Sequence, residues 1–221
     1  MATKFLKAGH HPDYLILASV FILAVFGLVM LASASSELGK LKFDDTYYYF
    51  KHQVINGLLV GIFGFLLASK LYYRHYQKLA LPLLLASLIA LVLVFTSLGY
   101  TAGGAGRWLT IGPITFQPAE LLKLTFIIYL AAWLSNPKNS RDKSFFEGYV
   151  PFLFITGLIG GLLVLQPATS TVVILLTAGL AVYFLSGAKV RYIALTIFLG
   201  LAALALIVYV TPYRLERVLG F

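Results

Sequence analysis

A glycine-rich segment with one charged side chain is the first place where this sequence could do chemistry. It covers Gly99–Gln117 and contains Arg107, which is followed directly by Trp108. Glycines let the backbone approach a ligand closely, and an arginine beside exposed backbone N–H groups can bind an anion such as a phosphate. A membrane-interface loop, with Arg107 reaching toward water and Trp108 at headgroup level, would use the same residues. The segment therefore has two open interpretations.

An acid and a base follow at the start of the next apolar segment. Pro118 suits the first position of a helix, which places Glu120 in the first turn, where a carboxylate complements the helix dipole. Lys123 falls on the same helix face. The pair can be a local stabiliser of the helix start or part of a polar cavity, because charges near the end of a span usually avoid lipid. We expect Glu120 and Lys123 to pair and to face protein.

A third polar segment separates two short apolar blocks. It begins Gln166-Pro167-Ala168 and continues with Thr169 and Ser170. Because proline cannot continue a helix, the segment predicts the turn of a helical hairpin. Thr169 or Ser170 is expected to cap the second helix.

The composition indicates that these segments belong to a membrane protein. The chain has 221 residues, of which 60% are hydrophobic and 11% charged, whereas about a quarter of a soluble domain is charged. We predict an all-α, polytopic transmembrane bundle of about seven spans that forms one integral membrane domain over residues 1–221. The first block is expected to be a retained span and not a signal peptide. The apolar blocks are Tyr14–Ala34, Gln53–Ala68, Leu79–Leu98, Pro118–Leu134, Tyr149–Leu165, Thr171–Leu185 and Arg191–Val210.

Charge and cysteine content narrow the function classes. The net charge is +9, and the excess lies in short loops, where lysine and arginine set membrane orientation; nucleic-acid binding is therefore not expected. The loop charges predict an N-terminus inside and a C-terminus outside. Arg107, Ala168 and Arg214 would then face outward, and Arg141 and Lys189 inward. The chain has no cysteine, so disulfides and thiolate metal sites are excluded.

The three polar segments together resemble those of the SEDS family (shape, elongation, division and sporulation), which includes FtsW, RodA and SpoVE. The family segment Gly-Ala-x-Arg-Trp is similar to Gly104–Trp108. Its Gln-Pro-Ser-Glu-x-x-Lys segment is similar to Gln117–Lys123, with Ala119 in place of the serine. Ser33–Ser36 resembles a Ser-x-Ser stretch of the family, and the order of spans and loops agrees throughout.

The chain also departs from the family pattern. Gln166 and Pro167 match the family's Gln-Pro-Asp-x-Gly-Thr segment, but Ala168 stands where the aspartate is expected and Ser170 where the glycine is. The family has about ten spans, and its proposed catalytic aspartate follows the seventh. The resemblance therefore implies the N-terminal seven-span portion of the family fold, with the catalytic residue unknown in this chain. The 221-residue chain alone is expected not to polymerise substrate.

The resemblance implies a peptidoglycan glycosyltransferase that polymerises lipid II during cell division or elongation. Its site residues would be Arg107, Glu120 and Lys123, which bind the pyrophosphate or maintain the cavity. The residues that support the motifs would be Gly104, Trp108, Gln117, Pro118, Gln166, Pro167 and Ala168. No cofactor or metal ligand set is evident in the sequence, although a divalent cation is compatible with it.

The implied partners are membrane lipids, lipid II, a class B penicillin-binding protein and other division or elongation proteins. The implied location is the bacterial cytoplasmic (inner) membrane, with several passes. The overall character of the sequence favours the division-type FtsW branch of the family over the RodA branch. A non-catalytic scaffold of the same machinery, which the missing acids favour, and a lipid or solute transporter are the alternative functions.

Overall fold

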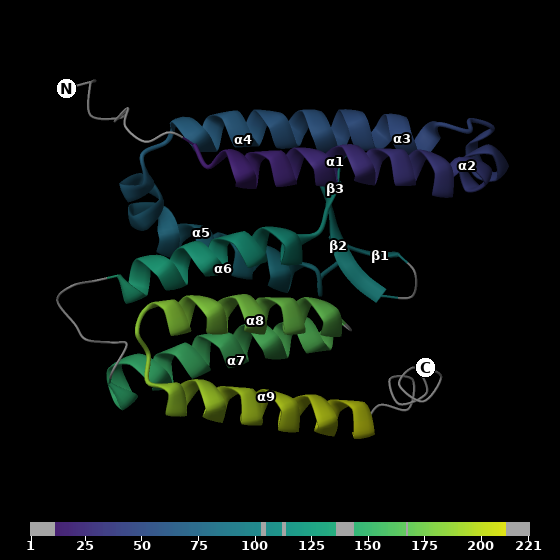
Figure 1. Ribbon diagram of the computed structural model, residues 1–221. Helices are drawn as coiled ribbons and strands as arrows, with labels where there is room; N and C mark the ends of the chain where they lie inside the picture. The colour runs from purple at the N-terminus through teal and green to yellow at the C-terminus, as the bar shows by residue number, and fades with distance from the viewer. Residues whose placement is uncertain (1–11, 103–104, 112–113, 136–143, 167, 211–221) are drawn as a thin grey trace. The chain divides into compact units, whose positions relative to one another are not determined.

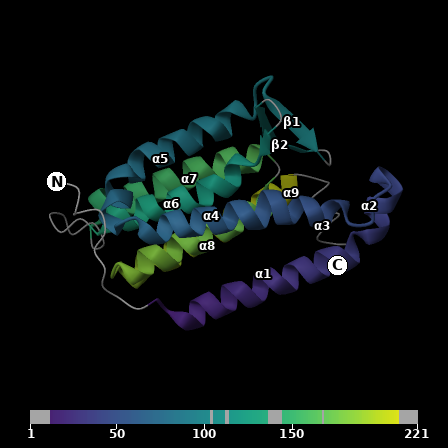
Figure 2. The same ribbon diagram turned by 90° about the horizontal axis from the view of Figure 1, so that it is seen from above.

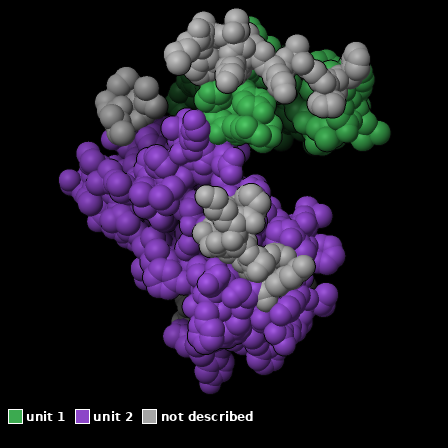
Figure 3. Space-filling view, turned by 90° about the vertical axis from the view of Figure 1, so that its left-hand side faces the viewer, with its two compact units in different colours: residues 1–75 green, residues 76–221 purple. Residues whose placement is uncertain are grey.

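The computed structural model describes residues 12–102, 105–111, 114–135, 144–166 and 168–210 (Figure 1). The chain forms two compact units, Met1–His75 and Tyr76–Phe221, which Figure 3 colours separately. Each unit is described by itself. The predicted single domain over residues 1–221 stays a prediction.

The first unit is helical, and among its described residues the membrane-length helices bury none of their side chains. Asp13 caps α1, because its carboxylate accepts hydrogen bonds from the N–H groups of Leu15 and Ile16 at 3.0 and 3.2 Å. After α1 the chain forms α2 and α3, and α3 runs through a π-helical stretch into α4. The elements are α1 (Tyr14–Ala34), α2 (Ser36–Phe43), α3 (Tyr48–His52), η2 (Gln53–Leu59) and α4 (Val60–Lys70).

The second unit contains the remaining helices and a small sheet, and α5 leads into it from the first unit. The predicted block Leu79–Leu98 is shifted toward the N-terminus in the structure, where α5 ends at Leu93. The elements are α5 (Tyr73–Leu93), β1 (Gly99–Ala102), β2 (Ala105–Ile111), β3 (Ile114–Phe116), α6 (Pro118–Leu134), η3 (Phe145–Tyr149), α7 (Val150–Leu165), α8 (Thr169–Leu185) and α9 (Val190–Val210).

The glycine-rich segment, expected to be a loop, forms a three-stranded antiparallel sheet in the order β1-β2-β3. Leu109 in β2 pairs with Gly99 of β1 on one side and Phe116 of β3 on the other. The side chain of Leu109 is buried. β3 ends directly before Gln117, so the sheet leads without a loop into α6. The sheet thus fixes where both Arg107 and the start of α6 lie.

The core of the second unit lies between α6, α7 and α8. Figures 1 and 2 show α6 and α8 side by side, in agreement with their direct contact. The buried Phe126 of α6 packs where α8 has Gly179, since a Cβ atom at that glycine would lie 2.9 Å from the ring. Thr125 donates a hydrogen bond to Ser87 of α5 at 2.9 Å. Small residues and buried hydroxyl pairs therefore join these helices, as in other membrane bundles.

The helical fold class is confirmed, and the protein is a multi-pass membrane protein. Among the described residues, five helices are long and apolar enough to cross a bilayer, and α8 is a shorter apolar helix. The fourth predicted block coincides with α6, which carries Glu120 and Lys123. The count of about seven spans and the orientation stay predictions. The five long helices are Tyr14–Ala34, Tyr48–Lys70, Tyr73–Leu93, Phe145–Leu165 and Val190–Val210.

We predict that Gly179→Ala lowers the free energy of unfolding by about 1–3 kcal/mol, because the added methyl group overlaps the Phe126 ring. Gly157→Ala in α7 is the matched control. A Cβ atom there meets nothing within 4 Å, so we expect a gain of about 0.5–1 kcal/mol. Thermal unfolding of the purified protein in detergent measures both. Equal shifts in Tm for the two variants would contradict the α6–α8 contact.

Candidate functional site

Gln166 is the residue at which distant segments of the second unit meet. It follows the last residue of α7, and its side chain is only 1% exposed. Its Nε2 donates a hydrogen bond to the backbone oxygen of Leu91 in α5 at 2.9 Å. Its own backbone oxygen accepts a hydrogen bond from Nε of Arg107 in β2 at 3.2 Å. Two of the three polar segments singled out in the sequence are therefore in direct contact.

The bond to Leu91 satisfies the end of α5. Leu91 lies in the last turn of this helix, where backbone oxygens have no partner within the helix. Leu91 is buried, so water does not serve as the alternative partner. The amide of Gln166 thus caps one helix while its backbone ends another.

The other side-chain atom of Gln166, Oε1, is buried and has no hydrogen-bond partner among the described residues. An unpaired buried acceptor costs about 1–3 kcal/mol. The turn therefore has the capacity to accept one further hydrogen bond from a donor.

The turn between α7 and α8 confirms the predicted helical hairpin. The N–H groups of Gln166 and Ala168 both donate to the backbone oxygen of Leu163, at 3.2 and 3.0 Å. Ala168 is buried and is itself the N-cap of α8, which begins at Thr169 without a side-chain cap. The expected capping by Thr169 or Ser170 was wrong. Pro167 and Gly104 lie outside the described residues.

The Glu120–Lys123 ion pair is confirmed, with 2.8 Å between Oε2 and Nζ. Pro118 begins α6 with Gln117 as N-cap, and Glu120 lies in the first turn, as expected. The side chain of Lys123 is 26% exposed and that of Glu120 is 59% exposed. Lys123 therefore faces protein as predicted, whereas Glu120 does not within the described part of the chain. The ion pair leaves the ammonium group of Lys123 positioned by its neighbour one turn away.

Arg107 and Trp108 take their places from the sheet. Trp108 pairs with Tyr100 of β1 across the strands and is partly buried. Successive side chains of a strand point to opposite faces, so Arg107 and Trp108 lie on different faces of β2. Arg107 is partly buried and lies on the face from which its Nε reaches the α7–α8 turn.

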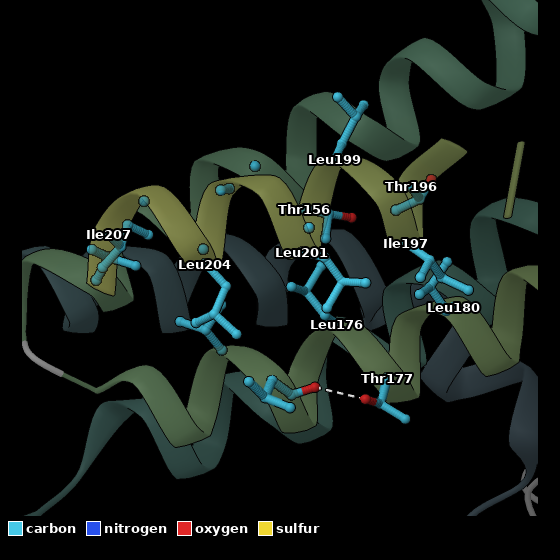
Figure 4. A pocket seen from close by; sticks show the side chains of 18 of the residues that line it. Thr156, Leu176, Thr177, Leu180, Thr196, Ile197, Leu199, Leu201, Leu204 and Ile207 are labelled. Atoms are coloured by element: carbon cyan, nitrogen blue, oxygen red, sulfur yellow. Dashed lines mark hydrogen bonds between the residues drawn. The ribbon is translucent and has the colours of Figure 1, made fainter. Parts of the chain in front are cut away.

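An apolar pocket of about 550 Å³ opens between α7, α8 and α9 (Figure 4). Val164 and Thr169, which flank the Gln166 turn on either side, both line it. Glycines on α7, among them Gly157 and Gly161, leave the wall without side chains, since a Cβ atom at either would meet nothing within 4 Å. The pocket was not predicted; the closely spaced glycines of α7 were the signal in the sequence that could have indicated it.

The threonines in the pocket wall keep it apolar. Thr156 donates its hydroxyl to the backbone oxygen of Phe152 at 2.6 Å, Thr177 to that of Val173 at 2.8 Å, and Thr196 to that of Tyr192 at 2.8 Å. Each hydroxyl is thus paired with its own helix, the usual arrangement for threonine inside a helix. The surface left for an occupant consists mainly of hydrocarbon.

A second, polar pocket of about 350 Å³ lies in the first unit. Lys51 forms an ion pair with Asp45 at 2.8 Å in its wall. The hydrogen bond that Lys51 donates within this ion pair is the main reason why the pKa of the Asp45 carboxyl lies below its usual value, and the hydrogen bond from the N–H of Tyr47 is the second. His52 and Asn56 complete the polar lining. Among the described residues, no group of three or more metal-ligating side chains gathers here or elsewhere, and a divalent cation stays a prediction.

The fold and the site define a polytopic helical membrane protein. In it, Arg107 of the small sheet is hydrogen-bonded to the turn that flanks an apolar pocket. The family described as "Cell cycle protein" (FtsW, RodA, SpoVE) matches residues 13–221. This chain belongs to that family, so the resemblance found in the polar segments is confirmed.

Curated relatives carry the name "Probable peptidoglycan glycosyltransferase FtsW". The one from Geobacter sp. strain M18 is 33% identical over 210 residues, which are 95% of this chain and 57% of that protein. One from Escherichia coli O157:H7 is 32% identical over 209 residues, which are 95% of this chain and 50% of that protein. The chain thus spans about half the length of these relatives.

Two solved structures are similar as well. The rod shape determining protein RodA of Thermus thermophilus is 32% identical with a TM-score of 0.60, over 82% of this chain and 58% of that one. A chain from a structure titled "Structural coordination of polymerization and crosslinking by a peptidoglycan synthase complex" is also 32% identical. Its TM-score is 0.62, over 88% of this chain and 57% of that one.

We predict that Gln166→Leu lowers the free energy of unfolding by about 1–3 kcal/mol, because the buried backbone oxygen of Leu91 loses its donor. Ser170→Ala, at an exposed position at the start of α8 that caps nothing, should change this free energy by no more than about 0.5 kcal/mol. Thermal unfolding in detergent measures the difference. If the leucine variant were as stable as the parent, Gln166 would not hold α5 to the turn.

Proposed function

We propose that this chain acts in a SEDS-type peptidoglycan glycosyltransferase that polymerises lipid II, and that it binds the lipid-linked pyrophosphate of this substrate. The observation that carries the proposal is the Arg107–Gln166 hydrogen bond, which anchors a cationic side chain at the turn flanking the apolar pocket. The names of the relatives, peptidoglycan glycosyltransferases, support the reaction class. A pyrophosphate at Arg107 and a lipid chain in the pocket correspond to the two parts of such a substrate.

The chemistry of glycan transfer suits Arg107. A pyrophosphate leaving group gains negative charge in the transition state, and fixed cations in a water-poor site stabilise that charge. The Nε–H···O bond to Gln166 fixes the plane of the guanidinium group, whose fork geometry matches phosphate oxygens. Lys123 adds a second cation, positioned by Glu120.

The apolar pocket suits the isoprenoid part of the substrate. Its volume of about 550 Å³ lies within the range of ligand pockets, roughly 300–1,000 Å³. Its lining comes from α7, α8 and α9 and includes Thr156, Leu180 and Thr196 (Figure 4). Several isoprene units of a polyprenyl chain would bury their surface there while the pyrophosphate stays near the turn.

The remaining assignments follow from the family. We propose one integral membrane domain in the bacterial cytoplasmic membrane, with Arg107 and Ala168 outside and Lys189 inside. The proposed partners are a class B penicillin-binding protein, lipid II, membrane lipids and other division or elongation proteins. The likeness to a chain of a complex that coordinates polymerization and crosslinking supports the penicillin-binding protein.

A non-catalytic scaffold is the second candidate, and Ala168 favours it. The residue is buried in the turn where the family pattern has an aspartate, and a methyl group neither accepts a proton nor binds a cation. Lipid II binding without glycan synthesis would support this function. Glycan strands formed with the partner would support the polymerase.

We predict that Arg107→Ala weakens lipid II binding by about 10- to 100-fold, the effect of losing hydrogen bonds to a charged group. Lys78→Gln removes an exposed charge of α5 and is expected to change binding less than about twofold. Binding of labelled lipid II to the purified chain measures both. The same preparations, with and without a class B penicillin-binding protein, are then tested for glycan strands by gel separation, and Ala168→Asp should raise any yield. Unchanged binding by Arg107→Ala would overturn the proposal.

The orientation is tested with single cysteines in this cysteine-free chain. Thr115→Cys in β3 should react with an impermeant maleimide in intact cells, and Lys189→Cys should react only after lysis, because the loop charges place them on opposite sides. Both positions are exposed in the structure, so accessibility to the reagent reports the side of the membrane. The reverse labelling pattern would invert the assignment.

A further inference from the structure

Two cations converge on one tyrosine ring at the turn between α8 and α9. The ring belongs to Tyr192, a buried residue in the first turn of α9. The guanidinium carbon of Arg191 lies 4.9 Å from the ring centroid, and its Nη2 donates a hydrogen bond to the Tyr192 hydroxyl at 3.0 Å. Nζ of Lys189 lies 6.0 Å from the same centroid. Both side chains are therefore drawn to the negative face of a single aromatic ring.

The ring is part of the fixed core of the second unit. Tyr192 stacks on Tyr149 with centroids 4.9 Å apart and planes 15° apart. The hydroxyls of Tyr149 and Thr196 are hydrogen-bonded at 3.3 Å, and Phe145 packs at the edge of the cluster. Because the platform is buried and stacked, the exposed cations on it are held in place before any ligand arrives. Preorganisation of this kind lowers the ordering cost of binding.

The cluster has excess positive charge that no acid in the described part of the chain neutralises. Two like charges gathered on one ring repel each other, and they sit at the start of a helix, where the helix dipole also disfavours cations. The first turn of α9 contains no acidic residue. Glu147 of η3 is the acid on the neighbouring element, and it forms no ion pair with Lys189 or Arg191. An anion bound between the two cations would remove the repulsion.

The position of the turn in the membrane identifies the anion. α8 and α9 are both apolar, and the turn between them is short. The flanking side chains of Leu185 and Val190 are 81% and 70% exposed, which suits contact with lipid. In Figure 1 the connection lies at the end of the unit that also holds the start of α7. A turn at the end of two spans lies at headgroup level, where phosphate is the abundant anion.

We propose that Lys189, Arg191 and Tyr192 form a binding site for the phosphate of an anionic phospholipid headgroup. The guanidinium fork of Arg191 binds two phosphate oxygens, and Lys189 adds a point charge from the other side. The Tyr192 hydroxyl accepts from Nη2 of Arg191 and so helps to orient the guanidinium group. The site is separate from the proposed pyrophosphate site and does not depend on the glycosyltransferase proposal.

The test uses the chain in nanodiscs of phosphatidylcholine with a trace of spin-labelled phosphatidylglycerol or spin-labelled phosphatidylcholine. The motionally restricted fraction of each label gives the preference of the protein for the anionic lipid. We expect a clear preference for phosphatidylglycerol, which the double variant Lys189→Gln/Arg191→Gln lowers by at least about tenfold, since hydrogen bonds between charged groups contribute about that factor. Both side chains are exposed, so the variant should retain its fold, which its Tm verifies.

The matched control is Lys70→Gln/Lys78→Gln, which removes the same charge from exposed positions around the α4–α5 turn. It should lower the preference clearly less, because exposed lysines outside the tyrosine-backed cluster act only through general surface attraction. If the two double variants lost the preference for phosphatidylglycerol equally, general surface charge would explain it, and the proposal would be overturned. Equal restricted fractions of the two labels with the parent protein would also overturn it, because the cluster would then not distinguish an anionic headgroup.

Discussion

The structure of the second unit depends on Gln166, which supplies hydrogen bonds where the chain leaves α7 inside an apolar helix bundle. Backbone groups exposed by the end of a helix must find partners where water is scarce, or each costs several kcal/mol. Gln166 ends α7, satisfies the end of α5 through Leu91, and offers its own backbone oxygen to Arg107. The same residue therefore joins a helix, a helical hairpin and a strand. Because Arg107 donates to this backbone oxygen, the position of its charge is set by the way the turn satisfies its backbone hydrogen bonds.

Glycines in the helices have two opposite effects on packing: one allows close helix contact, and others leave a pocket. At Gly179 the missing side chain lets Phe126 approach α8 closely, and α6 and α8 share the core. At Gly157 and Gly161 the missing side chains face no neighbour, and a pocket results. The hydrophobic effect does not drive helices together inside a bilayer, so close van der Waals contact decides which pairs associate. α7 is therefore tight against the core on one face and hollow on the face toward α9.

The parts predicted from the sequence were those governed by local spacing. The bounds of α1 and α6 agree with their apolar blocks, and Glu120 pairs with Lys123 because three positions in a helix bring side chains together. The contacts of Gln166 escaped prediction, since they join residues 75 and 59 positions apart. The sheet escaped too, because its glycine-rich strands lack the alternation that marks a half-buried strand. Ala168 as N-cap contradicts side-chain preference, and its backbone hydrogen bond to Leu163 closes the end of α7.

Two arginines of the second unit are positioned by different physical means, and α9 links their surroundings. Arg107 is tied to a backbone oxygen near one end of the apolar pocket, whereas Arg191 rests on the ring of Tyr192. Thr196, one turn after Tyr192, is hydrogen-bonded to the hydroxyl of Tyr149 and also lines the pocket. The wall that an apolar occupant would touch therefore continues into the platform for the headgroup. Contact alone is not energetic coupling, which requires that both ligands favour the same arrangement of α9. Since α9 packs against α8 along the pocket, a displacement of this helix would change both sites together.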